Sequence, residues 1–175
     1  LEQQYDMTVG SSANGLDLPS VNTDIKVTSI KQPQSSCPFK DSKQKIYGLG
    51  YNLIVFVYQK NDDTKIKKGS LDFLSCSFIE SSRTADYQTT TGILNIIANN
   101  GNVDDIFAFL IDHQIPSDEV TLMNMAEDIL KNPPKIGYLT ISNALQWRLQ
   151  YRRIVNLTET VEGITQIVKY SDDSE

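Results

Sequence analysis

One stretch of the chain combines positive charge with regularly spaced hydrogen-bond donors. Between residues 145 and 157, apolar side chains occupy one parity, and Gln146, Arg148, Gln150 and Arg152 occupy the other. This alternation predicts a long β-strand with one apolar face and one basic, amide-rich face. Guanidinium groups held in a row bind carboxylates or phosphates through paired hydrogen bonds. We therefore expect this face to be an interaction surface.

The charges on either side of this stretch are segregated. Residues 103–128 contain seven acidic residues and no Lys or Arg, whereas residues 129–157 contain five basic residues and no acid. The predicted interaction surface comprises Gln146, Arg148, Gln150, Arg152 and Arg153, extended by Lys65, Lys67 and Lys68. The predicted acidic counter-surface comprises Asp104, Asp105, Asp112, Asp118 and Glu119.

Three interpretations of the basic face compete. The face is solvated or neutralised by the acidic helices of the same molecule; it contacts the acidic helices of a neighbouring copy; or it binds RNA or an anionic membrane. The net charge of −6 counts against the third interpretation, because long-range repulsion from nucleic acid must be overcome locally.

The sequence contains no known catalytic motif, which gives little support to an enzymatic function. The chain has no Walker-type phosphate loop, dinucleotide fingerprint, HExxH, paired CxxC or nucleophile elbow. Its one imidazole, His113, ends an apolar helical stripe and is expected to be structural. Carboxylate pairs such as Asp104/Asp105 and Asp118/Glu119 fall in first helical turns, where they stabilise the helix. We predict no catalytic residue, no metal site and no cofactor.

The periodicities predict an α+β fold: a mostly antiparallel sheet interrupted by three consecutive helices, in the order ββ(β)-ααα-βββ. Strands are expected near 27–31, 46–59, 70–79, 136–141, 145–157 and 163–170, and the second and third of these are expected to form a hairpin. Between them, one helix includes 93–97, a second is capped by Asn102, and a third, capped by Ser117, runs to about Lys131.

The domain organisation expected from composition is simple. Residues 1–25 carry acids but no Lys or Arg and show no period, which predicts a flexible N-terminal arm. Residues 26–170 form a single α+β domain, and 171–175 an acidic tail. No apolar stretch is long enough for a membrane helix, so the protein is expected to be soluble. Its compartment stays open, with a virion and the host cytoplasm as the candidates. Whether Cys37 and Cys76 form a disulfide stays open.

The function expected from these features is that of a non-enzymatic structural protein that self-assembles or binds another protein, as viral coat, matrix and accessory proteins do. This expectation depends on the polar composition, the arm and the absence of a catalytic motif. A secreted or surface ligand-binding module is the first alternative. An RNA- or membrane-binding protein, or an enzyme of unrecognised class, is the next.

Overall fold

The computed structural model describes residues 15–38, 40–65, 67–143 and 146–169. The chain divides into two compact units. Unit 1 comprises Leu1–Ser35, Tyr51–Ser81 and Tyr151–Glu175, and unit 2 comprises Ser36–Gly50 and Ser82–Gln150. Within the described residues, no helix is both long and apolar enough to cross a bilayer.

Unit 1 is built on a four-stranded sheet. Its strand order is β1 (Thr23–Ser29), β3 (Asn52–Asp63), β4 (Lys68–Ile79) and β7 (Ile164–Val168). β1 runs parallel to β3, and the other two pairings are antiparallel. The alternation along β3 buries Leu53, Val55 and Val57 on one face of the sheet. Two short elements, the 3-10 turn η1 (Pro19–Val21) and the helix α6 (Arg152–Val155), complete this unit, while η2 (Ser81–Arg83) follows β4.

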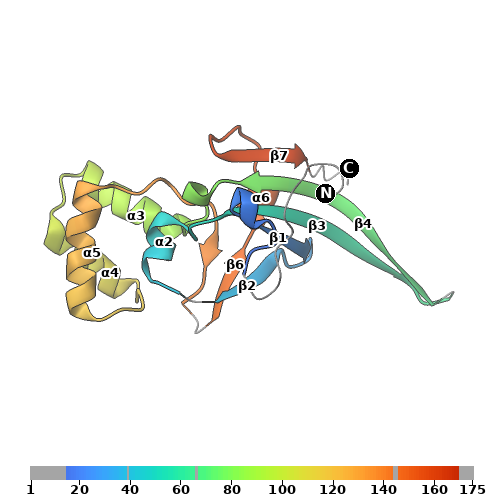
Figure 1. Cartoon of the computed structure of the whole chain (residues 1–175), viewed down its shortest axis with the longest axis horizontal. Coiled ribbons are helices and arrows are strands. Elements are labelled where there is room, and N and C mark those ends of the chain that lie inside the picture. Colours follow the sequence, from blue (N-terminus) through green and yellow to red (C-terminus); the bar gives the residue numbers. More distant parts are fainter. Residues whose placement is uncertain (1–14, 39, 66, 144–145, 170–175) are drawn as a thin grey trace. The chain divides into compact units, whose positions relative to one another are not determined.

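β3 and β4 extend beyond the rest of this sheet. β1 pairs with Asn52–Tyr58, and β7 pairs with Cys76–Ile79. Further out, the two strands pair with each other from Tyr58↔Phe73 to Asp63↔Lys68. In Figure 1 this outer part of the hairpin runs past the ends of β1 and β7. We call residues 59–72 the ribbon; all of its described residues are exposed.

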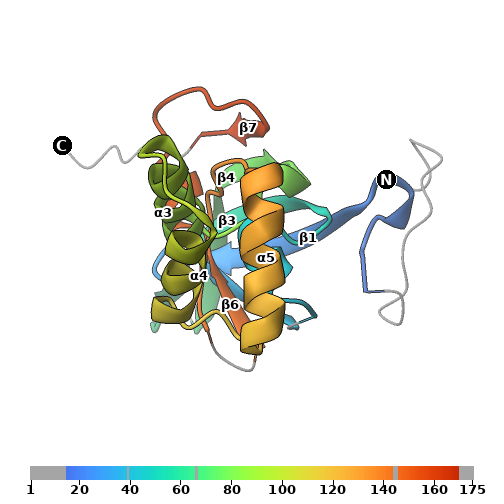
Figure 2. The ribbon, with the colours of Figure 1, turned by 90° about the vertical axis from the view of Figure 1, so that its left-hand side faces the viewer.

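Unit 2 contains the helices α2 (Lys43–Tyr47), α3 (Tyr87–Ala98), α4 (Val103–Asp112) and α5 (Glu119–Lys131). Its sheet has the order β2 (Gln34–Pro38), β6 (Gln146–Gln150) and β5 (Thr140–Ile141), with most of β2 in this unit. Figure 2 shows α4 beside both α3 and α5. Apolar residues at helical spacing pack between these helices, including Ile93, Ile106, Leu110, Met125 and Ile129.

The predicted fold class is confirmed. The protein is α+β, its strand pairings are mostly antiparallel, and three helices follow one another between the strands. Asn102 caps α4 as predicted, with a capping box to Asp105. The strands form two sheets, however, and α5 is capped by Asp118 rather than Ser117.

The long strand predicted over residues 145–157 is wrong. Strand β6 ends at Gln150, and Arg152–Val155 form a helical turn. Trp147 and Leu149 are buried, as the alternation predicts, but the adjacent residues Ile154 and Val155 are also both buried. One face of a strand does not bury two consecutive side chains, whereas a helical turn does. The basic side chains therefore do not form one continuous strand face.

Other boundaries also differ. β1 begins at Thr23, so residues 23–25 of the expected arm belong to a strand, and Ile46 and Tyr47, the expected start of the second strand, end the helix α2. The expected strand over 136–141 is reduced to β5. Residues 1–14 of the arm and the tail 171–175 lie outside the described residues. Cys37 and Cys76 are buried and are not joined by a disulfide.

Helices α3 and α5 are both capped by the Asp of an Asp-x-x-Thr sequence, one cap buried and the other exposed. The pair therefore tests how burial changes the contribution of a cap to stability. Asp86, buried in unit 2, accepts hydrogen bonds from Thr89 at its N–H (2.9 Å) and hydroxyl (2.7 Å), and from the N–H of Ile141 (2.7 Å). Asp118 makes the same two bonds to Thr121 at an exposed position.

We expect Asp86→Ala to lower the free energy of unfolding by about 2–4 kcal/mol, because it removes a cap and leaves the buried amide of Ile141 without an acceptor. Asp118→Ala is the control and should cause a clearly smaller loss, since water reaches the groups it exposes. Urea unfolding followed by circular dichroism measures both. Equal losses for the two variants would contradict the role given to the Ile141 contact.

Candidate active site

A short hairpin at the start of unit 1 brings two carboxylates together. Leu18 and Thr23 exchange two backbone hydrogen bonds, of 2.9 and 3.1 Å. Between them lies η1, which begins with Pro19, and the residue that follows it, Asn22, is in the left-handed conformation (φ 49°). Proline presets the backbone angle of a first helical position, and Asn tolerates the left-handed region. The residues flanking this closed turn, Asp17 and Asp24, therefore lie side by side.

The contacts of these carboxylates are specific. Asp17 Oδ2 accepts a 2.8 Å hydrogen bond from the N–H of Ile25, and its carboxyl group lies close enough to that of Asp24 for each to shift the pKa of the other. Lys26 Nζ lies 2.6 Å from Asp24 Oδ2. Because alternate residues of a strand point to the same face, Asp24 and Lys26 share one face of β1. The three side chains form a connected set, Asp17, Asp24 and Lys26.

Because β1 is an edge strand, the backbone N–H of Ile25 can donate to the Asp17 side chain instead of to another strand. β1 pairs with β3 along one side, and the N–H of Ile25 points to the other side, where it meets Asp17. In a strand, the N–H and C=O of one residue point to the same side, so the Ile25 carbonyl faces this open edge as well. An edge strand thus offers oxygen atoms beside the two carboxylates.

The two carboxyl groups have opposite pKa shifts. Burial raises the pKa of Asp24, and the hydrogen bond to Asp17 raises it further, although the contact with Lys26 opposes both effects. The hydrogen bonds from Asp24 and from the Ile25 amide lower the pKa of Asp17. Asp24 therefore holds a proton to higher pH than an ordinary aspartate, while Asp17 stays ionised.

Asn52, the first residue of β3, supports the turn between the carboxylates. Its amide Nδ2 donates to the carbonyl of Val21 (3.3 Å) and to Oγ1 of Thr23 (3.5 Å). Its backbone N–H donates to the carbonyl of Asn22 at 2.8 Å. Its Oδ1 in turn accepts from the N–H of Ser81 at 2.9 Å. The hairpin is therefore fixed to the sheet at the position where it turns toward Asp24.

The donor set fits a divalent cation of the magnesium type. Mg²⁺ is held in proteins by one or two carboxylates, with water and substrate phosphates completing its shell. Asp17 and Asp24 supply two adjacent carboxylates, and the Ile25 carbonyl faces the same edge. Across the described residues, no group of three or more His, Cys, Asp or Glu side chains is arranged around a common metal position. The set thus matches an ion that keeps open positions for substrate rather than a closed structural site.

The predicted interaction residues are divided between different elements. In β6 of unit 2, Arg148 and Gln150 are exposed, and the side chain of Gln146 lies outside the described part. Arg152 and Arg153 are exposed on α6 of unit 1, where Arg152 Nη2 donates to the carbonyl of Lys31 at 3.4 Å. Lys65, Lys67 and Lys68 lie at the tip of the ribbon.

The predicted acidic counter-surface is exposed but partly committed to helix ends. Asp105 accepts from the N–H of Asn102 at 2.8 Å, and Asp118 caps α5. Asp104 lies in the first turn of α4, Asp112 ends it, and Glu119 begins α5. These positions agree with the helix-stabilising role expected for such acids.

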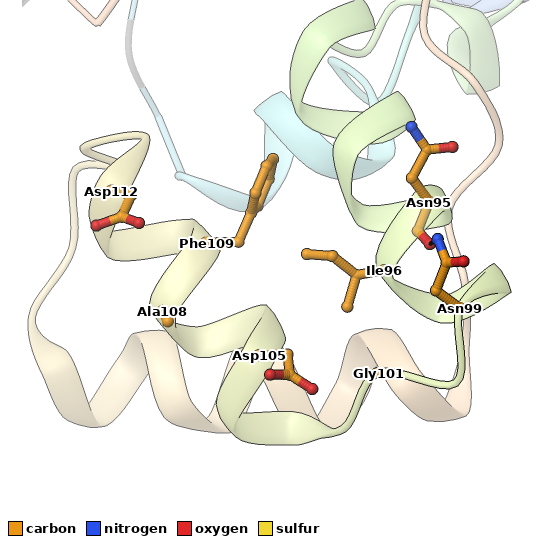
Figure 3. A pocket seen from close by; sticks show the side chains of 8 residues that line it. All are labelled: Asn95, Ile96, Asn99, Gly101, Asp105, Ala108, Phe109 and Asp112. Carbon is orange, nitrogen blue, oxygen red and sulfur yellow. Dashed lines mark hydrogen bonds between the residues drawn. The ribbon is translucent and has the colours of Figure 1, made fainter.

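A groove between α3 and α4 is lined partly by this acidic set (Figure 3). Asp105 and Asp112 contribute carboxylates, which repel phosphates, and the Asn99 amide is bonded to the carbonyl of Asn95 at 2.8 Å. His113, expected to be half-buried, is exposed; its ring stacks on Phe109 with centroids 3.8 Å apart. Neither feature resembles a catalytic centre.

Sequence reasoning missed Asp17, Asp24 and Lys26. The expected arm ended at residue 25, which separated the two aspartates from the lysine that follows them. The available signal was a strand-like D-x-K at residues 24–26, preceded by a second Asp and by the turn-forming residues Pro19 and Asn22. Lys26 is the basic member of this set, and it was missed because the acidic segment was assigned to an arm that ended one residue before it.

Comparison with known proteins identifies the family. The model of the family described as type II restriction enzyme NspV matches residues 1–166. The type II restriction enzyme NspV of Nostoc sp. (strain ATCC 29411 / PCC 7524) is 50% identical over 169 residues, which cover 97% of this chain and 77% of that protein. No solved structure matches.

These matches overturn the function expected from the sequence. A non-enzymatic, self-assembling structural protein of viral type is wrong, because both matches are to an enzyme. Another protein, RNA and an anionic membrane, which were expected as partners with it, are not the partners of a restriction enzyme, and a virion location has no support. Association with another copy is compatible with both matches and stays a prediction. The chain belongs to the family of the type II restriction enzyme NspV.

Proposed function

We propose that this protein is a magnesium-dependent endonuclease that hydrolyses phosphodiester bonds in double-stranded DNA, with Asp17, Asp24 and Lys26 as its active site. The observation that carries the proposal is the cluster of two carboxylates and a lysine at the open edge of β1: the Leu18–Thr23 pairing places Asp17 beside Asp24, and Lys26 Nζ lies 2.6 Å from Asp24. Membership of a restriction-enzyme family supports DNA as the substrate.

The roles of the residues follow from their contacts. Asp17 and Asp24 would hold the cation through carboxylate oxygens, with the Ile25 carbonyl beside them. When bound there, a divalent cation supplies Lewis-acid stabilisation of negative charge on the phosphate oxygens. The Ile25 amide fixes the orientation of Asp17, and the hairpin closed by Leu18 and Thr23 fixes its distance from Asp24.

Lys26 supplies a positive charge at the same place. Its ammonium group is 2.6 Å from Asp24 Oδ2, so it is held on the face that the phosphate would approach. From there it donates hydrogen bonds to a phosphate oxygen or to the attacking water as negative charge develops in the transition state. It also orients the carboxylate of Asp24.

The net charge of −6 does not oppose this proposal once the charges are considered locally. DNA binding depends on basic groups that reach the phosphates rather than on the charge of the whole chain. Unit 1 places Lys31, Arg152 and Arg153 at exposed positions and carries the three lysines of the ribbon tip.

The proposed active site is tested by single substitutions assayed on duplex DNA with Mg²⁺. We expect Asp24→Asn and Asp17→Asn each to lower the cleavage rate at least about a thousandfold, because each removes a carboxylate that holds the cation. Lys26→Ala should lower it about a hundredfold or more, since it removes one stabilising donor.

Asp104→Asn is the matched control, an exposed aspartate in the first turn of α4, and should keep full activity. Discrete fragments from a plasmid, abolished by EDTA, are the expected product of the unmodified protein. If that protein leaves DNA intact with Mg²⁺, or if Asp24→Asn cleaves normally, the proposed function is wrong.

The raised pKa of Asp24 predicts a distinctive dependence on pH. A carboxyl group whose pKa is raised by folding destabilises the folded state when it is ionised, and this burden disappears as pH falls through the raised pKa. Asp24→Asn should therefore be more stable than the unmodified protein at neutral pH, and the difference should shrink in acid. Over the same pH range, cleavage by the unmodified protein should fall as Asp24 becomes protonated.

Urea unfolding of both proteins at a series of pH values measures the difference in stability. A constant difference from neutral pH down to pH 4 would show that burial of the Asp24 charge is not its cause.

A further inference from the structure

We infer that the ribbon, residues 59–72, is a DNA-binding arm that lies in the major groove of duplex DNA and places three tip lysines on the phosphate backbone. The inference rests on the proposed function, because the ribbon belongs to the same unit as Asp17, Asp24 and Lys26. It adds a surface that the active site does not require.

The ribbon is long and has no third strand beside it. Gln59–Asp63 pairs with Lys68–Asp72, and in the described part of the chain no other strand joins these residues. Five residues of strand extend about 17 Å at about 3.4 Å per residue. An isolated two-stranded hairpin is marginally stable in water, so a ribbon of this length gains stability when it is bound. Its dimensions suit the major groove, which admits a two-stranded β-ribbon.

The charges of the ribbon are separated along its length. The acids of the stem are engaged locally: Asp62 pairs with Lys60 at 3.0 Å, and Asp72 accepts from the amide of Asn61 at 2.5 Å. The tip carries Lys65, Lys67 and Lys68, all exposed, and no ion pair to them is found within the described residues. Asp63 lies at the same tip, opposite Lys68, and accepts a 2.8 Å hydrogen bond from the N–H of Lys65. Three lysines against this one aspartate leave the end of the arm with a net positive charge, which suits a phosphate backbone.

The side chains of the stem also favour DNA over an apolar protein surface. Between Gln59 and Ser70, the described residues are polar, charged or Gly. Among the described residues of the hairpin, the large apolar side chains that are exposed are Leu71 and Phe73, and both lie at its base. Phe73 contacts Phe56 of the sheet, with ring centroids 6.0 Å apart. The outer part of the ribbon thus has the polar and basic surface typical of a protein–DNA interface.

The first test removes the tip charges. We expect Lys65→Ala/Lys67→Ala/Lys68→Ala to weaken binding of a labelled 30-base-pair duplex in EDTA by about tenfold or more at 0.1 M salt, and to reduce the slope of log K against log salt by about 2–3. The control, Lys43→Ala/Lys131→Ala/Lys169→Ala, removes three exposed lysines outside the ribbon and should change the slope much less. An unchanged affinity and slope for the tip variant would overturn the inference.

The second test removes the arm. Residues 61–70 are replaced by Asn-Gly, which joins the paired residues Lys60 and Leu71 through a two-residue turn. Because the deleted residues described here are exposed, the rest of the fold should persist, as circular dichroism would verify. The bound duplex should lose protection at some guanine N7 atoms, which face the major groove. Full N7 protection, or loss of self-association with unchanged DNA affinity, would show that the ribbon serves another purpose.

Failure of this inference is distinguishable from failure of the proposed function. Cleavage of DNA by the unmodified protein, together with unaltered binding by the tip variant, overturns the ribbon alone. Absence of cleavage with Mg²⁺ overturns the proposed function alone, since binding in EDTA is measured separately.

Discussion

The proposed active site depends on holding two carboxylates in contact although their charges repel. A hairpin closed by Leu18 and Thr23, and fixed to β3 through Asn52, prevents Asp17 and Asp24 from moving apart. The Ile25 amide and the Lys26 ammonium each compensate part of the negative charge. A divalent cation bound beside the two carboxylates would neutralise the negative charge that remains. The hairpin therefore favours binding of such an ion.

This arrangement requires an edge strand. β1 pairs with β3 along one side, which leaves Ile25 able to donate to a side chain rather than to a further strand. Exposed edges of sheets are usually protected, because they pair with other chains. Here the turn that precedes β1 folds back over its own edge and converts the unpaired amide into a support for Asp17. The hydrogen bond from Ile25 to Asp17 thus both protects the edge of the sheet and holds the candidate site together.

The same sheet also accounts for the ribbon. β3 and β4 continue after β1 and β7 have ended, so their outer halves have solvent on both faces. Polar and basic residues suit that environment, and the apolar alternation of β3 stops near the position where its neighbours end. The apolar first half of β3 therefore suits a packed sheet, and its polar second half suits a projecting arm exposed to solvent.

The sequence by itself determined the α+β class, the helices around Ile93, Ile106 and Met125, the Asn102 cap and the hairpin of β3 and β4, because these depend on periodicity and local hydrogen bonds. It did not reveal where β6 ends, since only packing shows that Ile154 and Val155 are both buried. Nor did it reveal the candidate site. Asp17 and Asp24 resemble the acids of a polar arm until the hairpin closed by Leu18 and Thr23 brings them together, and the bonds from Asn52 of β3 that hold this hairpin are part of the tertiary structure.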